Sequence, residues 1–125
     1  MNGHKYLLDT NAIVALLQGE PALLALLNNA QWIGICVISQ IEFLAFSGLT
    51  SSDKQLFTQF LQRVEVIGLD ASQTNIIEQT IKLRLKYRLK LPDAIIAATA
   101  LHKQASLVTA DKELTKVSEI TVIAW

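Results

Sequence analysis

Five short, unbroken apolar runs, separated by longer segments of helical character, constrain the fold of this chain more than any other feature. The runs occupy 5–8, 33–38, 64–69, 106–109 and 121–124. They do not alternate apolar and polar residues, which is typical of strands buried on both faces of a sheet. Strands that alternate with helices favour parallel pairing. We therefore expect an α/β fold, with a central parallel β-sheet flanked by helices in an α/β/α sandwich.

Several helix boundaries can be predicted from the sequence. Pro21 favours a helix start and predicts a helix over 21–27, and Pro92 predicts the first turn of another that runs to 103. Three polar pairs with capping-box spacing predict further starts: Ser39 with Glu42, Ser52 with Gln55, and Asp70 with Gln73. Over 81–91 apolar and basic residues alternate, but the isoleucine and leucine spacing of four predicts a helix that ends near Tyr87.

Length and composition indicate one domain over residues 1–125. Half of the residues (51%) are hydrophobic, and eleven basic side chains balance eleven acidic ones, so no global positive charge attracts nucleic acid. No apolar stretch reaches the ~20 residues of a membrane span, so we expect no membrane partner. A single cysteine, Cys36, excludes a disulfide scaffold. These features predict a cytoplasmic protein.

Four acidic residues lie where a parallel sheet collects its ligands. Asp9, Glu42 and Asp111 follow predicted strands, and Asp93 lies in the first turn of a predicted helix. Ligands of open α/β sheets bind beyond the carboxyl ends of the strands. We therefore expect these four carboxylates to converge at one edge of the sheet.

Each carboxylate also has a purely structural explanation. Asp9 is placed to cap a helix, Glu42 to close the capping box of Ser39, and Asp93 and Asp111 to interact with helix dipoles. Together, however, two such charges ~5 Å apart repel by roughly 3 kcal/mol at an effective dielectric constant of about 20. A cation would relieve that repulsion. Oxygen ligands without nearby histidine or cysteine suit Mg²⁺ or Mn²⁺ better than zinc.

Four sequence blocks resemble the signature motifs of PIN domains, and in particular the VapC-type ribonuclease toxins of toxin–antitoxin pairs. They are LDTN at 8–11, ISQIE at 38–42, LPDAIIAATA at 91–100 and VTAD at 108–111. The resemblance spans nearly the whole chain. It implies a Mg²⁺-dependent endoribonuclease, with Mn²⁺ as a substitute, that cleaves RNA as a toxin, forms a homodimer and binds a cognate antitoxin protein. One departure lies before the expected fourth strand, where family members often carry a glycine and this chain has Gln104-Ala105.

The same resemblance assigns roles to individual residues. Asp9, Glu42, Asp93 and Asp111 form its catalytic acidic quartet, and Thr10, Asn11 and Thr109 support that quartet. We expect Asp9 and Asp93 to bind the metal directly and Asp111 to hold a second or water-bridged ion. Glu42 would orient or deprotonate the attacking water.

Basic residues at alternate positions over 82–90 precede Asp93 and have two explanations. They form either a local RNA-binding patch, in which Arg88 and Lys90 contact RNA, or the solvated face of a helix. Apolar helices over 21–27 and 52–61 are candidate protein interfaces.

Two other functions remain open from the sequence. A catalytically silent PIN-like module would bind RNA or protein without cleaving it. A receiver-like signalling domain also gathers aspartates at strand ends. Such a domain needs a pair of aspartates near the first strand and a lysine at a fixed place after a later strand. Here Asp9 stands alone in its run, and no lysine occupies the required place.

Overall fold

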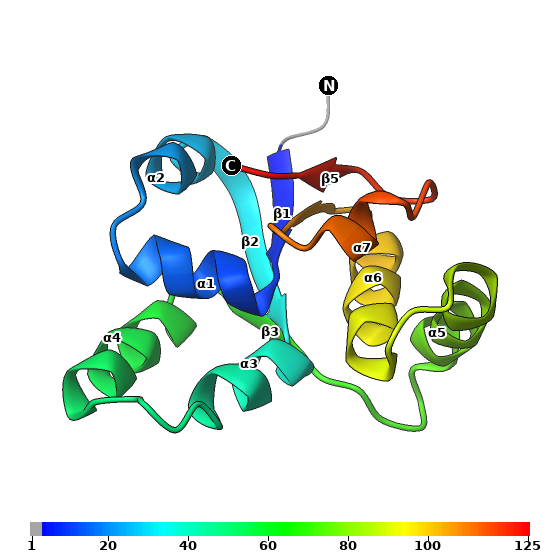
Figure 1. The fold of residues 1–125 in the computed structure, drawn as a ribbon, viewed down its shortest axis with the longest axis horizontal. Helices are drawn as coiled ribbons and strands as arrows, with labels where there is room; N and C mark the ends of the chain where they lie inside the picture. Colours follow the sequence, from blue (N-terminus) through cyan, green and yellow to red (C-terminus); the bar gives the residue numbers. More distant parts are fainter. Residues whose placement is uncertain (1–3) are drawn as a thin grey trace.

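The computed structural model describes residues 4–125 and contains five strands and seven helices. Figure 1 shows helices on both sides of a central sheet. In chain order the elements are β1 (His4–Leu8), α1 (Thr10–Leu17), α2 (Pro21–Leu27), β2 (Ala30–Cys36), α3 (Val37–Leu44), α4 (Ser51–Leu61), β3 (Glu65–Ile67), α5 (Thr74–Tyr87), α6 (Leu91–Lys103), β4 (Ser106–Val108), α7 (Lys112–Thr115) and β5 (Val122–Ile123).

All paired strands of the sheet are parallel, in the order β3-β2-β1-β4-β5. The α/β/α prediction is therefore confirmed. The second strand differs from its predicted range of 33–38, because it begins at Ala30 and ends at Cys36. Val37 and Ile38 already belong to α3. An apolar run that crosses from a buried strand into a buried helix contains no boundary signal.

Two hydrophobic cores lie on opposite faces of the sheet, and neighbouring residues of each central strand alternate between them. Leu7 of β1 and Leu107 of β4 pack in the core that includes α5 and α6. Leu8 and Val108, the next residues along, pack in the core that includes α1 and α4. Burial of both faces explains why the strand sequences are continuously apolar.

The predicted helix starts have mixed outcomes. Pro21 and Pro92 lie in the first turns of α2 and α6, as expected. The capping box at Ser39 is wrong, because α3 begins earlier, at Val37, and Ser39 is completely buried.

The other two capping predictions are displaced from the true helix starts. The observed box at α4 joins Thr50 and Asp53 rather than Ser52 and Gln55. Gln73 does accept a hydrogen bond from the Asp70 amide, but α5 begins only after that pair, at Thr74.

The end of α5 falls where the sequence predicts it, at Tyr87. Arg88 follows with φ of 56°, a left-handed conformation that terminates a helix. The chain then enters α6 at Leu91, so the loop that separates the two helices is short.

Within residues 4–125, no single helix is long and apolar enough to cross a membrane. Of the helices in this range, only α1 and α2 taken together reach the length and apolar composition of a membrane span, and the two helices are bent by 106° relative to each other.

Candidate functional site

The order of the strands places the candidate site between β1 and β4. The connections that lead from β1 to β3 run over one face of the sheet, whereas α5 and α6 lead back to β4 over the other face (Figure 1). This reversal leaves a crevice at the carboxyl ends of the two adjacent strands, the place where open α/β sheets bind ligands. Asp9 follows β1 and Thr109 follows β4 at this point.

Asp9 is buried, with 5% of its surface exposed, and three donors hold its carboxylate. Oδ1 accepts a hydrogen bond of 2.8 Å from the Thr10 amide, so Asp9 caps α1 as one structural explanation predicted. Oδ2 accepts a hydrogen bond of 2.7 Å from the Thr109 hydroxyl and another of 3.3 Å from the Asn11 side-chain amide. The carboxylate is thus fixed in one orientation at the crevice.

Asn11 ties the two strand ends together. Its Nδ2 donates to the Thr109 hydroxyl at 3.3 Å as well as to Asp9. Its Oδ1 accepts a hydrogen bond of 3.0 Å from the backbone amide of Ala110, in the loop after β4. Thr10, Asn11 and Thr109, the predicted supporting residues, therefore all contact predicted acidic residues or one another.

Glu42 reaches the crevice from α3. The Thr10 hydroxyl donates a hydrogen bond of 2.6 Å to Glu42 Oε1. Glu42 does not pair with Ser39 as a capping residue, because Ser39 lies inside the helix. The structural explanation of Glu42 as half of a capping box is therefore wrong.

Asp93 and Asp111 come to the same region from α6 and from the start of α7. Both are half-buried. Asp111 Oδ1 accepts a hydrogen bond of 2.9 Å from the Glu113 amide, so Asp111 caps α7. The backbone amide of Asp111 donates a hydrogen bond of 3.0 Å to the Thr109 hydroxyl. Asp93 lies in the first turn of α6.

The electrostatics of the four carboxylates link them to one another. Burial raises the pKa of the Asp9 carboxyl above its usual value, the bonds from Thr109 and Thr10 oppose that rise, and the charges of Glu42 and Asp111 add to it. Burial also raises the pKa of Asp93, and the charges of Asp111, Asp9 and Glu42 raise it further. This mutual influence agrees with the hydrogen bonds, in which Thr10 contacts both Asp9 and Glu42 and the Thr109 hydroxyl contacts both Asp9 and the Asp111 amide, at one edge of the sheet.

The donor chemistry of this cluster suits a hard divalent cation, although the carboxylates do not form a ready ligand set. Over residues 4–125, no three His, Cys, Asp or Glu side chains are arranged to hold a metal ion. Asp9, Glu42 and Asp111 each give an oxygen to a protein donor instead. All four side chains offer only oxygen, however, and neighbouring carboxylates that repel one another are the setting in which a divalent cation is favourable.

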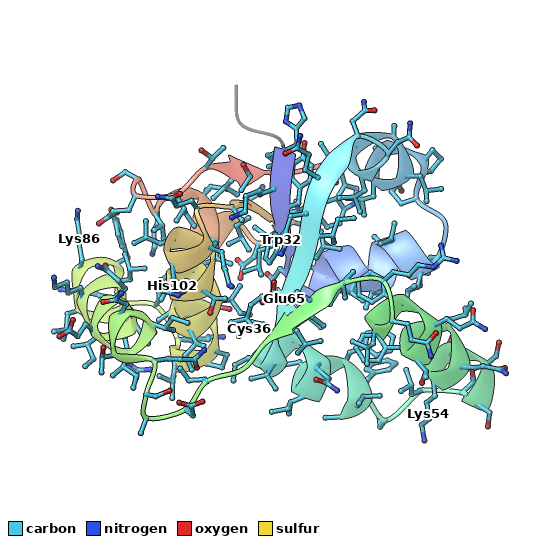
Figure 2. The ribbon with its side chains drawn as sticks, turned by 180° about the vertical axis from the view of Figure 1, so that it is seen from behind. Trp32, Cys36, Lys54, Glu65, Lys86 and His102 are labelled. Carbon is cyan, nitrogen blue, oxygen red and sulfur yellow. The ribbon has the colours of Figure 1, made fainter. Side chains whose placement is uncertain are left out.

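The basic residues before the site divide into two groups. The charge of Lys90, the residue that precedes α6, lowers the pKa of Asp93, so its ammonium lies near the acidic site. Lys86 instead pairs with Glu119 at 3.0 Å and lies on the outer side of α5 (Figure 2). Arg88 is exposed in the left-handed turn between α5 and α6.

The sequence did not reveal an apolar cavity that opens beside Thr10 and Glu42. Its volume is about 290 Å³, and its walls come mainly from α1, α3 and α4. Val14, Phe46 and Leu56 line it although each is more than one-third exposed. Only the three-dimensional arrangement unites these residues, because they come from separate helices and from the loop between α3 and α4.

Comparisons with known proteins agree with this architecture. The family model described as PIN domain matches residues 6–120. The chain therefore belongs to the PIN-domain family, in which nuclease activity is general. No curated protein sequence matches the chain significantly.

Solved structures of toxin–antitoxin proteins are similar to the chain over nearly its whole length. A toxin–antitoxin complex from Klebsiella pneumoniae has 28% identity and a TM-score of 0.77, with 94% of this chain and 95% of that chain covered. VapBC2 from Rickettsia felis, bound to a promoter DNA fragment, has 24% identity and a TM-score of 0.80, with 97% and 98% covered. VapBC-1 from nontypeable Haemophilus influenzae has 21% identity and a TM-score of 0.78, with the same coverage.

Proposed function

We propose that this protein is a divalent-metal-dependent endoribonuclease that acts as a toxin and is inhibited by a cognate antitoxin protein. The observation that carries the proposal is the gathering of Asp9, Glu42, Asp93 and Asp111 at the β1/β4 crevice. Four mutually repelling carboxylates at a ligand-binding edge are costly for folding and useful for holding metal. Similarity to toxins that were solved in complex with antitoxins supports the biological role.

Asp9 and Asp93 would hold a divalent cation directly, and Asp111 would hold a second or water-bridged ion. Mg²⁺, with Mn²⁺ as a substitute, supplies the positive charge that phosphodiester hydrolysis requires. The hydrogen bonds from Thr109 and Asn11 keep Asp9 Oδ2 oriented. A fixed carboxylate loses little conformational entropy when it binds a ligand.

Glu42 would orient the attacking water and accept its proton. The Thr10 hydroxyl engages Oε1, which leaves Oε2 for the water. Lys90, close to Asp93, would contact an RNA phosphate, with Arg88 from the preceding turn beside it.

Cleavage of labelled single-stranded RNA by the purified protein tests the nuclease activity. We expect cleavage with Mg²⁺ or Mn²⁺ and none with excess EDTA. Asp93→Asn should lower the rate at least about 100-fold. Glu78→Gln, which removes one negative charge from an exposed position on α5, is the matched control and should cleave normally.

Two results would contradict the proposal. Undiminished cleavage by Asp93→Asn would remove Asp93 from the catalytic site. RNA binding without cleavage by the wild type, in the presence of either metal, would instead support the catalytically silent RNA-binding module.

A further inference from the structure

Ser39 carries a buried hydroxyl that has no hydrogen-bond partner among the residues from 4 to 125. The residue is completely buried in α3. A buried hydroxyl without a partner costs folding free energy, because it has given up its bonds to water. In native proteins most buried polar side-chain atoms have a hydrogen-bond partner, either a protein group or an ordered water.

The usual partner of a buried helical hydroxyl is out of reach for Ser39. Two buried threonines each donate a hydrogen bond of 2.7 Å to the backbone carbonyl four residues earlier: Thr80 to Ile76 and Thr99 to Ile95. The residue four before Ser39 is Ile35, which belongs to β2 and precedes the first turn of α3. The helix thus offers Ser39 no carbonyl of this kind.

The place of Ser39 in the fold points to the acidic site. It lies three residues before Glu42 and four before Phe43, and residues at these spacings share one side of a helix. Phe43 and Glu42 border the same cavity as Thr10. The helix itself packs against α1, which Asp9 caps, and against α6, which carries Asp93.

Cys36, at the start of the same helix, supports this placement. Thr99 Oγ1 of α6 lies 3.7 Å from Cys36 Sγ, and Figure 2 shows Cys36 at the end of β2 beside α6. Burial raises the pKa of the Cys36 thiol, and the charges of Glu42 and Asp9 raise it further. Cys36 and Glu42, which flank Ser39 at three residues on either side, are therefore both close to Asp9.

We propose that Ser39 is a positioning residue of the acidic site, and that its hydroxyl hydrogen bonds to a water molecule carried by the bound divalent cation. This inference rests on the metal site of the proposed function. Mg²⁺ and Mn²⁺ keep several waters when carboxylates bind them, and those waters need partners in the protein. A neutral hydroxyl can serve as a partner without adding another negative charge to the four already present.

Mn²⁺ binding to Ser39→Ala, followed by electron paramagnetic resonance, tests this role. Loss of such an outer partner typically weakens metal affinity at least 10-fold, so we expect a Kd for Mn²⁺ about 10-fold higher than that of the wild type. The water-proton couplings of bound Mn²⁺ should change as well. The metal-free variant should melt no lower than the wild type, because its hydroxyl had no partner to lose.

Thr80→Val is the matched control, because it removes a buried hydroxyl that is already bonded to Ile76. It should lower the melting temperature and leave Mn²⁺ affinity unchanged. Wild-type affinity and water couplings in Ser39→Ala would overturn the inference alone, as would a fall in its metal-free melting temperature like that of Thr80→Val. A wild type that binds no Mn²⁺ would overturn the proposed metal site and this inference with it.

Discussion

The Thr109 hydroxyl donates a hydrogen bond of 2.7 Å to Asp9 Oδ2, joining two buried residues that are 100 positions apart in the chain. The same hydroxyl oxygen accepts a hydrogen bond of 3.0 Å from the Asp111 amide and one of 3.3 Å from Asn11 Nδ2. One threonine therefore connects the end of β1, the start of α1 and the loop that carries Asp111. The bond also offsets part of the cost of burying the Asp9 carboxylate.

Thr109→Val should destabilise the protein by about 1–3 kcal/mol, because it leaves a buried carboxylate and two other polar groups with one partner fewer. It should also raise the pKa of Asp9, since the Thr109 bond now lowers it. Urea unfolding measures the first effect and carbon NMR of the Asp9 carboxyl measures the second. Thr58→Val, which removes an exposed hydroxyl on α4, should change stability little, and equal losses in the two variants would contradict this account.

Asp93→Asn should stabilise the metal-free protein at neutral pH. Burial and the neighbouring carboxylates raise the pKa of Asp93 above its ordinary value of 3.8, so its proton is held more tightly in the folded than in the unfolded chain. The resulting stability is fully present below pH 3.8 and is lost as the pH rises through the raised value. The free-energy difference between the variant and the wild type should therefore grow from pH 4 to pH 7, as measured by urea unfolding in EDTA. A difference that stays constant would contradict the predicted coupling.

The layered fold was predictable because its signals are local. Unbroken apolar runs marked the strands, and Pro21 and Pro92 marked two helix starts. The helix start at Val37 was not predictable, because the boundary falls within an apolar segment and the Ser39–Glu42 spacing imitates a cap. Tertiary burial of α3 decided that boundary.

The candidate site shows the same division. Asp9, Glu42, Asp93 and Asp111 could be expected at one sheet edge, because chain order alone brings strand ends together. The partners of each carboxylate could not be predicted. That Asn11 bonds to the amide of Ala110, and Thr10 to Glu42, depends on the register of β1 with β4 and on the packing of α3 against α1.

Mn²⁺ should stabilise the folded wild type, because a cation bound at the carboxylates relieves their repulsion in the folded state only. At 100 times Kd the gain is about 2.7 kcal/mol. Thermal melts with and without Mn²⁺ measure it. Asp93→Asn should lose most of the gain, whereas Glu78→Gln should retain it, and an equal shift in all three proteins would show that Mn²⁺ acts elsewhere.

Gln104→Gly should stabilise the protein by up to about 1 kcal/mol, because a side chain in the left-handed region is strained and glycine is not. Gln104 ends α6 with φ of 53°, in the left-handed region that glycine adopts without strain. Chemical denaturation measures the change. The variant should bind Mn²⁺ as the wild type does, since the turn lies at the opposite end of α6 from Asp93, and a loss of stability would contradict the strain argument.

Leu56→Lys should weaken the complex with a cognate antitoxin while leaving RNA cleavage intact. Leu56 of α4 is 43% exposed and lines both the cavity beside Glu42 and a second apolar cavity of about 400 Å³ toward Leu24 of α2. These are the two helices that the sequence marked as candidate interfaces, and a lysine there would place a charge against any apolar partner. Co-purification after co-expression measures the complex.

The matched control for that experiment is Leu85→Lys, at a leucine that is 78% exposed on α5, on the other side of the sheet. It should co-purify with the antitoxin as the wild type does. Light scattering of both variants tests the predicted homodimer at the same time, because the variant that becomes monomeric identifies the helix on which two copies meet. If Leu56→Lys retained the antitoxin and Leu85→Lys lost it, the partner would bind the α5 face instead.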